Sequence, residues 1–520
     1  MNPVRYRSKL IRNSLFFGSA QFIHLLCTLV LTPFVIHTIG LTQFGVWTVF
    51  SAITSIFLLL DLGLTASYLK FISQHYATKD FDRLNAVINS GFIFSIALYG
   101  PLLLVAFVLR MPLYTLLNIG PSVYEDTDLI FAGVLLVVLI IMAGSSYSAV
   151  LKSVQRLEIY STITTTAILI KTALVFFLLS RGLELKGLLL SELFFVSSVH
   201  VTSIYFARRF VPSMRINLRL FRFQELKEMI QFGVKLQVSQ VSNLVHQQAD
   251  KLLLSNLLSP ASVSLYQVAQ QIANLLRLVT SFVLPVVLPA ASELTAQEDR
   301  KGLKQLCTKG LRYVSLISFS LAVYIWASAD QLIMFWLGST AFDESITALK
   351  WLIVVSAITP LTGFLATVGR GIGVVEYEVR GSLLLILVQL PLNFWFISVY
   401  GVEGAAMGVL IAVLVSQSYF VIQFQKHTHI LQVPEISKFS FKLLLAILPS
   451  LLLIQLCKPY IASELLANRV TGGAMLLGEM LLYYLILLAS LYFLKCIDRE
   501  DFMMFLELYK SNTDNKEQEQ

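Results

Sequence analysis

Apolar runs long enough to cross a bilayer recur along the whole chain, and they constrain the fold more than any other feature. A membrane-spanning helix needs about 20 consecutive apolar residues. The sequence predicts fourteen such segments, at residues 13–38, 43–69, 86–109, 129–151, 161–180, 187–206, 229–257, 262–291, 313–336, 346–369, 381–399, 404–424, 441–457 and 472–494. The thirteenth segment is short and the twelfth is not sharply bounded, so twelve or thirteen spans remain open alternatives.

The composition agrees with this pattern. Hydrophobic residues make up 56% of the 520 residues and charged residues 13%, about half of the charged fraction of an average soluble domain. A single globular core cannot bury this much apolar surface, because too little polar surface remains to cover it. The chain is therefore expected to be an all-α polytopic membrane protein. Soluble enzymes, secreted disulfide scaffolds and disordered regulators are excluded.

Four cysteines lie far apart, at Cys27, Cys307, Cys457 and Cys496. They lack the paired spacing of metal ligands or of a disulfide framework. We expect them to be small apolar or cytosol-facing residues, with no metal site.

Basic residues divide unevenly between the two sides of the membrane. With the N-terminus placed inside, 29 of the 39 Lys and Arg fall in cytoplasmic segments and six in outer loops, when charges near a span end are counted with the adjoining loop. Cytoplasmic loops carry this excess in membrane proteins, so both termini are expected in the cytoplasm. No A-x-A cleavage site follows the first span, which we expect to be retained. The net charge of +8 then indicates an affinity for the anionic inner leaflet, and no nucleic-acid partner is expected.

The two halves of the chain are related by a weak internal repeat. Five groups of residues recur in order at offsets of 215 to 219, among them Phe17-Gly18 with Phe232-Gly233, Asp80 with Asp299, and Gly187 with Gly404. Six spans per repeat is an even number, so both repeats enter the membrane from the same side. We expect two lobes related by a pseudo-twofold axis along the membrane normal, as in transporters with a cavity between lobes. A duplicated helical scaffold without transport is the alternative.

The repeat sets the expected domain boundaries. They are an N-terminal lobe at residues 1–206, a basic cytoplasmic linker at 207–228, a C-terminal lobe at 229–424, two additional helices within 441–494, and a cytoplasmic tail at 495–520.

Three of the predicted spans carry polar side chains along one helical face, which would be unfavourable against lipid. We expect these faces to line a shared central cavity. The candidate cavity residues are Gln21, His24, Asn243, His246, Gln267, Gln270, Gln271 and Asn274.

Charged residues inside the predicted spans cost about 2.5–3.5 kcal/mol each at a lipid-facing helix centre, so they are expected to face the interior. For Lys171 and Glu192, structural ion pairing is an equal alternative. Arg277 is the strongest candidate for binding an anion, because a guanidinium stays charged and grips phosphate oxygens in a fork. The candidate headgroup-binding residues are Arg277, Lys235, Lys251 and Lys171. The candidate acids for coupling to a proton or sodium gradient are Asp61, Asp250 and Glu479.

Short motifs in the first lobe resemble those of a known transporter family. They are the run Asp61-Leu62-Gly63-Leu64, the following Tyr68-Leu69-Lys70, the Ala77–Asn85 loop, and the preceding Gly40–Trp47 turn. The chain thereby resembles the Wzx-type O-antigen and exopolysaccharide flippases of the multidrug/oligosaccharidyl-lipid/polysaccharide exporter superfamily. The resemblance extends over nearly the whole chain through the span count and the repeat.

The resemblance implies a non-enzymatic flippase of the bacterial inner membrane. Its substrate would be an undecaprenyl-pyrophosphate-linked oligosaccharide repeat unit, moved from the inner to the outer leaflet for surface polysaccharide synthesis. A polysaccharide polymerase and a chain-length regulator are further expected partners, and no cofactor is expected beyond a coupling ion.

Other classes remain as alternatives. A cation-coupled multidrug exporter is weakened because the first span has no acid, and a peptidoglycan lipid-precursor flippase because the first spans lack arginine. A membrane-embedded polysaccharide polymerase is the runner-up from another class, and a channel ranks third.

Overall fold

The computed structural model describes residues 3–120, 126–338, 342–458 and 469–496. Within these ranges the regular structure is helical throughout, with no β-strand. The expectation of an all-helical polytopic membrane protein is therefore confirmed.

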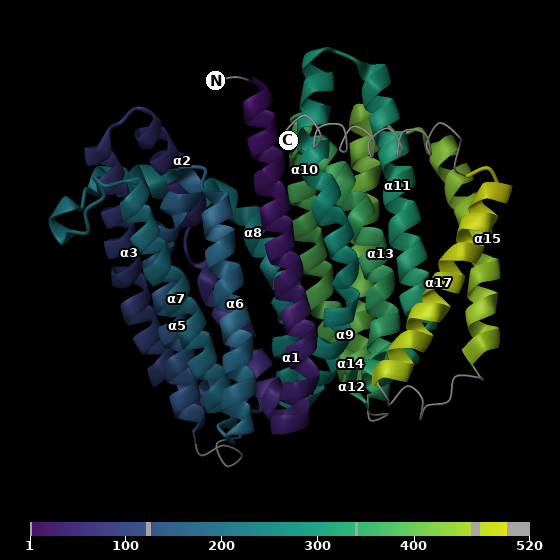
Figure 1. Cartoon of the computed structure of the whole chain (residues 1–520), viewed down its shortest axis with the longest axis horizontal. Helices are drawn as coiled ribbons and strands as arrows, with labels where there is room; N and C mark the ends of the chain where they lie inside the picture. The colour runs from purple at the N-terminus through teal and green to yellow at the C-terminus, as the bar shows by residue number, and fades with distance from the viewer. Residues whose placement is uncertain (1–2, 121–125, 339–341, 459–468, 497–520) are drawn as a thin grey trace. The chain divides into compact units, whose positions relative to one another are not determined.

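The contacts divide the chain into two compact units, each of which is a helical bundle (Figure 1). Unit 1 comprises residues 1–272 and 376–419, and unit 2 comprises residues 273–375 and 420–520.

Unit 1 contains the helices of the first half of the chain and three elements that follow them. Its helices are α1 (Pro3–Leu59), α2 (Leu64–Ala77), α3 (Phe81–Val108), α4 (Arg110–Leu116), α5 (Thr127–Ser153), α6 (Leu157–Ser180), α7 (Glu184–Phe210), the 3₁₀ turn η2 (Leu218–Leu220), α8 (Phe223–Leu257), α9 (Pro260–Ala273) and the first part of α14 (Glu376–Thr428). Helices α1, α6, α7, α5 and α3 pack in that order, each against the next. The unit thus has a continuous helical wall along one side of α1.

Unit 2 is built from the remaining helices. They are α10 (Leu275–Ala296), α11 (Arg300–Ala327), α12 (Ala329–Leu337), α13 (Asp343–Gly371), the end of α14, α15 (Val433–Cys457) and α17 (Arg469–Phe493). Here α10, α13, α11, α15 and α17 pack in sequence, each against the next.

Ten of the described helices are long and apolar enough to cross a membrane. Two of them, α1 and α14, are each interrupted by one glycine with non-helical backbone angles. These are Gly40 (φ 84°, ψ 166°) and Gly401 (φ 63°, ψ −137°). Only glycine adopts such positive φ values readily, so each glycine joins two helices with no loop between them. The more polar α8, α9 and α10 are not among the ten, and the total of fourteen spans stays a prediction.

The backbone repeats between the two halves of the chain. Asp80 caps α3 by accepting from Arg83 N at 3.1 Å, and Asp299 caps α11 by accepting from Gly302 N at 2.8 Å. Each cap follows a residue with left-handed backbone angles, Lys79 or Glu298, at the same offset of 219 residues. Within unit 1, α2 packs on α3 and α5, and within unit 2, α10 packs on α11 and α13. The internal repeat inferred from the sequence therefore recurs in capping and packing, while the lobe boundaries and the symmetry axis stay predictions.

Helix α8 packs closely on the beginning of α2. Ser67 Oγ donates to Met229 O at 2.6 Å, and Gln237 donates to Leu59 O. Beside them the backbones of Gly63 and Gly233 touch, so that a Cβ atom on either glycine would collide with the other chain segment. Gly63 also has φ +72°, which disfavours any side chain. The two glycines therefore set how closely α2 and α8 approach.

Replacing Gly233 by alanine should destabilise the protein by about 1–3 kcal/mol, because the added methyl group must displace backbone atoms. The matched control is Gly100→Ala in α3, where a Cβ would meet no atom within 4 Å. A thermal unfolding series in detergent should show a lower midpoint for Gly233→Ala alone. Equal midpoints for both variants would contradict the close α2–α8 contact.

Candidate functional site

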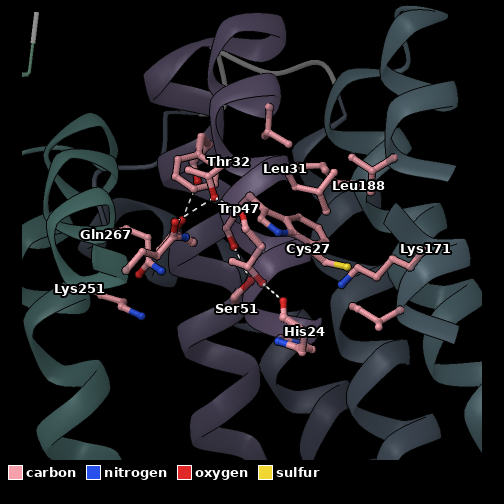
Figure 2. Close-up of a pocket in the computed structure, with 17 residues that line it drawn as sticks. His24, Cys27, Leu31, Thr32, Trp47, Ser51, Lys171, Leu188, Lys251 and Gln267 are labelled. Carbon is pink, nitrogen blue, oxygen red and sulfur yellow. Dashed lines mark hydrogen bonds between the residues drawn. The ribbon is translucent and has the colours of Figure 1, made fainter. Parts of the chain in front are cut away.

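A cavity of about 210 Å³ opens inside unit 1, between α1, α6, α7, α8 and α9 (Figure 2). Its lining combines polar, aromatic and aliphatic side chains. The lining residues are His24, Cys27, Thr28, Leu31, Thr32, Val35, Phe44, Trp47, Thr48, Ser51, Ile168, Lys171, Val175, Leu188, Lys251, Gln267 and Gln271. A site of this kind offers both charge and hydrogen bonds to a ligand with polar groups.

The hydroxyl groups of α1 are held by their own helix. Thr28 Oγ donates to His24 O at 3.0 Å, and Thr32 Oγ lies 2.9 Å from Thr28 O. Thr32 Oγ also lies 2.9 Å from the side-chain oxygen of Gln271, which connects α1 to α9. Back-bonding to the preceding turn lets hydroxyl side chains stay inside an apolar helix while keeping lone pairs free to accept further bonds.

Two lysines enter the cavity from opposite walls (Figure 2). Lys171 of α6 forms an ion pair with Glu192 of α7. Lys251 of α8 is 8% exposed, and no ion pair with it occurs among the described residues. The neighbouring Asp250 interacts with Lys251 electrostatically but forms no ion pair with it. A buried ammonium group that forms no ion pair attracts an anion strongly, since little water remains to solvate it.

Asp250 is the centre of a buried polar network in unit 1. The Tyr266 hydroxyl donates to Asp250 Oδ2 at 2.6 Å, and the side-chain amides of Gln389 and Asn393 donate to Oδ1 at 2.7 and 2.5 Å. Asp250 and Asn393 are 1% and 0% exposed, so these bonds are shielded from solvent. His246 Nδ1 extends the network, at 2.7 Å from Gln389 Oε1. Three helices, α8, α9 and α14, thereby meet at one carboxylate.

The other two candidate coupling acids lie in different surroundings. Asp61 Oδ1 accepts from Gly63 N at 2.8 Å and Oδ2 accepts from Thr65 N at 3.3 Å, so both oxygens cap the start of α2. Glu479, in unit 2, is 5% exposed and accepts from Ser328 Oγ at 3.0 Å. Its second oxygen has no hydrogen-bond partner among the described residues. Coupling roles for all three acids stay predictions.

The structure brings together some of the residues selected from the sequence. His24, Lys171, Lys251, Gln267 and Gln271 line one cavity. His246 belongs to the Asp250 network instead. The remaining candidates of unit 1 are not among the lining residues; they are Gln21 and Asn243, which are exposed, and Gln270, which is half-buried.

Three further candidates are not among the residues that line the cavity. One lies in unit 2, and the side chains of the other two lie outside the described residues. Asn274 directly precedes α10 in unit 2. The backbones of Lys235 and Arg277 belong to α8 and α10, but their side chains lie outside the described residues. Their proposed contact with an anion stays a prediction.

Several residues of the site were not selected from the sequence. Trp47, Thr48 and Ser51 lie beyond the glycine break of α1 and complete the cavity wall. Gln389 and Asn393 are two amides four residues apart in the otherwise apolar stretch 383–397 of α14, a spacing that places them on one face. That spacing is the one sequence pattern that indicates a polar partner for this part of α14.

The fold is that of a polytopic membrane protein, and comparisons with known proteins show its family. The chain belongs to the family described as "Polysaccharide biosynthesis protein", which matches residues 39–346, more than half of the chain. The resemblance found in the sequence motifs is thereby confirmed.

Two known proteins are similar to this chain in sequence. One is the membrane protein EpsK of Bacillus subtilis (strain 168), 25% identical over 64% of this chain and 66% of its own length, which is just under two-thirds. The other is a Shigella flexneri protein named as an O-antigen transporter, 21% identical over 74% of this chain and 91% of its own length.

Solved structures share the fold. The lipid II flippase MurJ in an inward closed conformation aligns over 92% of this chain and 98% of its own, with a TM-score of 0.72 and 15% identity. An inward-facing multidrug transporter of the MATE family, within the MOP superfamily, aligns over 78% and 94%, with a TM-score of 0.67 and 16% identity. The relatives and structures with a functional name are transporters or flippases, which supports the expectation of a non-enzymatic membrane protein.

Replacing Asp250 tests whether this acid holds a buried hydrogen-bond network together. Asp250→Ala removes the acceptor of three buried hydrogen bonds, each loss costing about 1–3 kcal/mol, whereas Asp250→Asn keeps one oxygen in place. We expect the alanine variant to unfold at a clearly lower temperature in detergent than the asparagine variant. Gln231→Ala, on the exposed face of the same helix, should unfold like the parent protein. Identical midpoints for both Asp250 variants and the parent would contradict the network.

Proposed function

We propose that this protein is an alternating-access flippase for polyprenyl-pyrophosphate-linked oligosaccharide repeat units. It moves them from the inner to the outer leaflet of the bacterial inner membrane for the synthesis of O-antigen, exopolysaccharide or capsule. The observation that carries the proposal is the cavity of unit 1, which combines an unpaired buried lysine with amide, hydroxyl and indole groups. Membership of a polysaccharide biosynthesis family supports the same substrate class.

The charges of the cavity suit an anionic headgroup. A phosphate that enters a low-dielectric interior loses hydration worth tens of kcal/mol, so it needs cations at the site. Lys251 offers an ammonium group that forms no ion pair among the described residues, and Lys171 offers a second one if the anion replaces Glu192. Arg277 and Lys235 are the further candidates for this contact.

The uncharged groups of the cavity suit a sugar. Gln267 and Gln271 each supply both hydrogen-bond donors and acceptors, and Thr28 and Ser51 supply hydroxyls. Trp47 adds a flat apolar surface with one N–H donor, on which the apolar face of a sugar ring can stack. These groups replace the hydrogen bonds that sugar hydroxyls lose when they leave water.

Asp250 is our preferred coupling residue, for a proton or a sodium ion. As a carboxylate it accepts all three bonds described above, whereas protonation turns one acceptor into a donor. One bond must then break or reverse, and α8, α9 and α14 can shift against one another. Asp61 is less suited, because its two oxygens already cap α2. Glu479 remains a candidate through its unpartnered oxygen.

The membrane orientation and the partners complete the proposal. The distribution of Lys and Arg supports cytoplasmic termini. The product, a lipid-linked repeat unit on the outer leaflet, is the material for a polysaccharide polymerase and its chain-length regulator, which are therefore the proposed protein partners.

A lipid-precursor flippase is the second candidate. The alignment with MurJ, over 98% of that chain, favours it. A multidrug exporter is the third, given the MATE alignment. The two flippase functions share a polyprenyl-pyrophosphate and differ in the sugar, so they are distinguished by which lipid-linked sugar accumulates when the gene is deleted. Drug sensitivity without any accumulation would favour the exporter, and product of altered chain length would favour a polymerase.

Lys251→Met should block export, because the cavity then lacks its unpaired cation. We expect surface polysaccharide to fall at least about tenfold, the factor that corresponds to 1.4 kcal/mol of lost binding. Lipid-linked oligosaccharide should accumulate on the inner leaflet, at unchanged levels of membrane-inserted protein. Lys251→Arg should retain part of the activity, and Lys301→Met, at an exposed lysine of unit 2, should retain all of it. Normal export by Lys251→Met would refute the assigned role.

Arg277→Ala tests the residue selected first from the sequence. A guanidinium that holds phosphate in two parallel bonds is poorly replaced by lysine, so both Arg277→Ala and Arg277→Lys should lose surface polysaccharide while the protein still inserts. Full export by Arg277→Ala would show that the cavity lysines suffice without it.

A further inference from the structure

The connection between α7 and α8 is held in an extended path by side chains of α3. Asn85 donates to Ser213 O at 2.9 Å and accepts from Arg215 N at 2.7 Å. Asn89, one turn further along α3, donates to Arg215 O at 2.8 Å and accepts from Asn217 N at 3.0 Å. Two amide side chains on one face of a helix thus pair with the connection as a neighbouring β-strand would.

Ser90 completes this arrangement. Its hydroxyl accepts from Arg222 N at 2.8 Å and lies 3.2 Å from Arg222 O. Residues 213–222, here named the clamped linker, are therefore fixed to α3 at both ends. They lie at the end of unit 1 where the α2–α3 turn also lies (Figure 1).

The clamped linker lies beside the residues that precede the apolar stretch of α3. Helix α3 is almost continuously apolar from Phe92 to Val108. At 1.5 Å per residue, the clamping residues Asn85 and Ser90 lie within about 10 Å of Phe92 along the helix axis. This depth corresponds to the headgroup layer, on the side that the Lys and Arg distribution assigns to the cytoplasm.

The outer face of the clamped linker and the start of α8 carries large apolar side chains between arginines. All of them are exposed, Leu218 by 68% and Phe223 by 69%. The apolar members are Ile216, Leu218, Phe221 and Phe223, and the basic members are Arg215, Arg219 and Arg222. We name these seven residues the linker face.

The charge of the linker face is not neutralised locally. No acid occurs between residues 211 and 224, and its arginines form no ion pair among the described residues. The next acid, Glu225, is buried and points to Arg83 at 3.8 Å and His75 at 3.9 Å. The three guanidinium groups are left to bind anions outside the protein.

We infer that the linker face is a docking surface for anionic phospholipid of the adjoining leaflet. Its four apolar side chains enter the boundary between headgroups and acyl chains, and its arginines bind headgroup phosphates. The inference does not depend on which substrate the cavity carries.

The clamp is what makes this docking favourable. Extended backbone enters the membrane boundary only when its N–H and C=O groups have partners, and Asn85, Asn89 and Ser90 supply them. Exposed apolar groups interleaved with arginines match the chemistry of an anionic lipid surface, where each basic residue near the headgroups adds about fivefold to binding.

The experiment uses the full-length protein with its four cysteines replaced by alanine and a polarity-sensitive fluorophore at Leu218→Cys or Phe223→Cys. The protein is reconstituted in phosphatidylcholine vesicles with and without phosphatidylglycerol. A lipid quencher near the headgroup and aqueous iodide report the depth of each probe. The matched position is Asp82→Cys, an exposed residue one turn further from the apolar part of α3.

Probes at 218 and 223 should be quenched by the lipid and protected from iodide, more so with phosphatidylglycerol, whereas the probe at 82 should be quenched by iodide. Each of Arg215→Gln, Arg219→Gln and Arg222→Gln should lower the ratio of lipid to iodide quenching about fivefold in phosphatidylglycerol vesicles. Replacing Arg300, Lys301 and Lys304 by glutamine, an equal loss of charge at the start of α11, should leave it unchanged.

Two results would overturn the inference. The first is iodide quenching at 218 and 223 in both vesicles, which would leave the linker face to a protein partner. The second is equal lipid quenching with and without phosphatidylglycerol, which would remove the role of the arginines.

Discussion

In the hydrocarbon layer every polar group must find its partner inside the protein, and the rest of this structure follows from that constraint. It explains why the regular structure of the described ranges is helical, and why threonines of α1 donate back to their own helix. It also explains why Lys171 pairs with Glu192, and why Asp250 collects three donors from two other helices. Lys171, Glu192 and Asp250 thus each have an ion-pair or hydrogen-bond partner inside the protein.

Lys251 is the exception, and for that reason it indicates the site. A buried cation that forms no ion pair is unfavourable, and a protein can retain one where a ligand supplies a compensating charge. Around it the cavity presents groups that hydrogen-bond without charge, and one indole. The cavity therefore has the chemistry for an anion attached to a polar, uncharged group, which is also the chemistry of a sugar on a phosphate. The neighbouring Asp250 network places a second ionisable centre on the same helix, facing different partners.

Periodicity and composition were sufficient to predict the helical membrane fold, the internal repeat and a group of cavity residues on α1, α6, α8 and α9, because these depend on local patterns. The partners of Asp250 could not be predicted in this way. Gln389 and Asn393 lie about 140 residues from Asp250 in sequence, so only the folded chain brings them together. Asp61 shows a second limit of prediction from sequence. An acid inside a predicted span can be a coupling residue or the cap of a helix, and the structure shows Asp61 capping α2. For Lys171 and Glu192 the sequence left pairing and ligand binding equally open, and the structure shows the pair.

The glycines that interrupt α1 and α14 have a consequence for the outside of the cell. In the expected orientation, Gly40 and Gly401 each turn the chain back into the membrane on the outer side with no loop between the two helices. At these two crossings the protein therefore offers almost no peptide on that side of the membrane for a protease to cut.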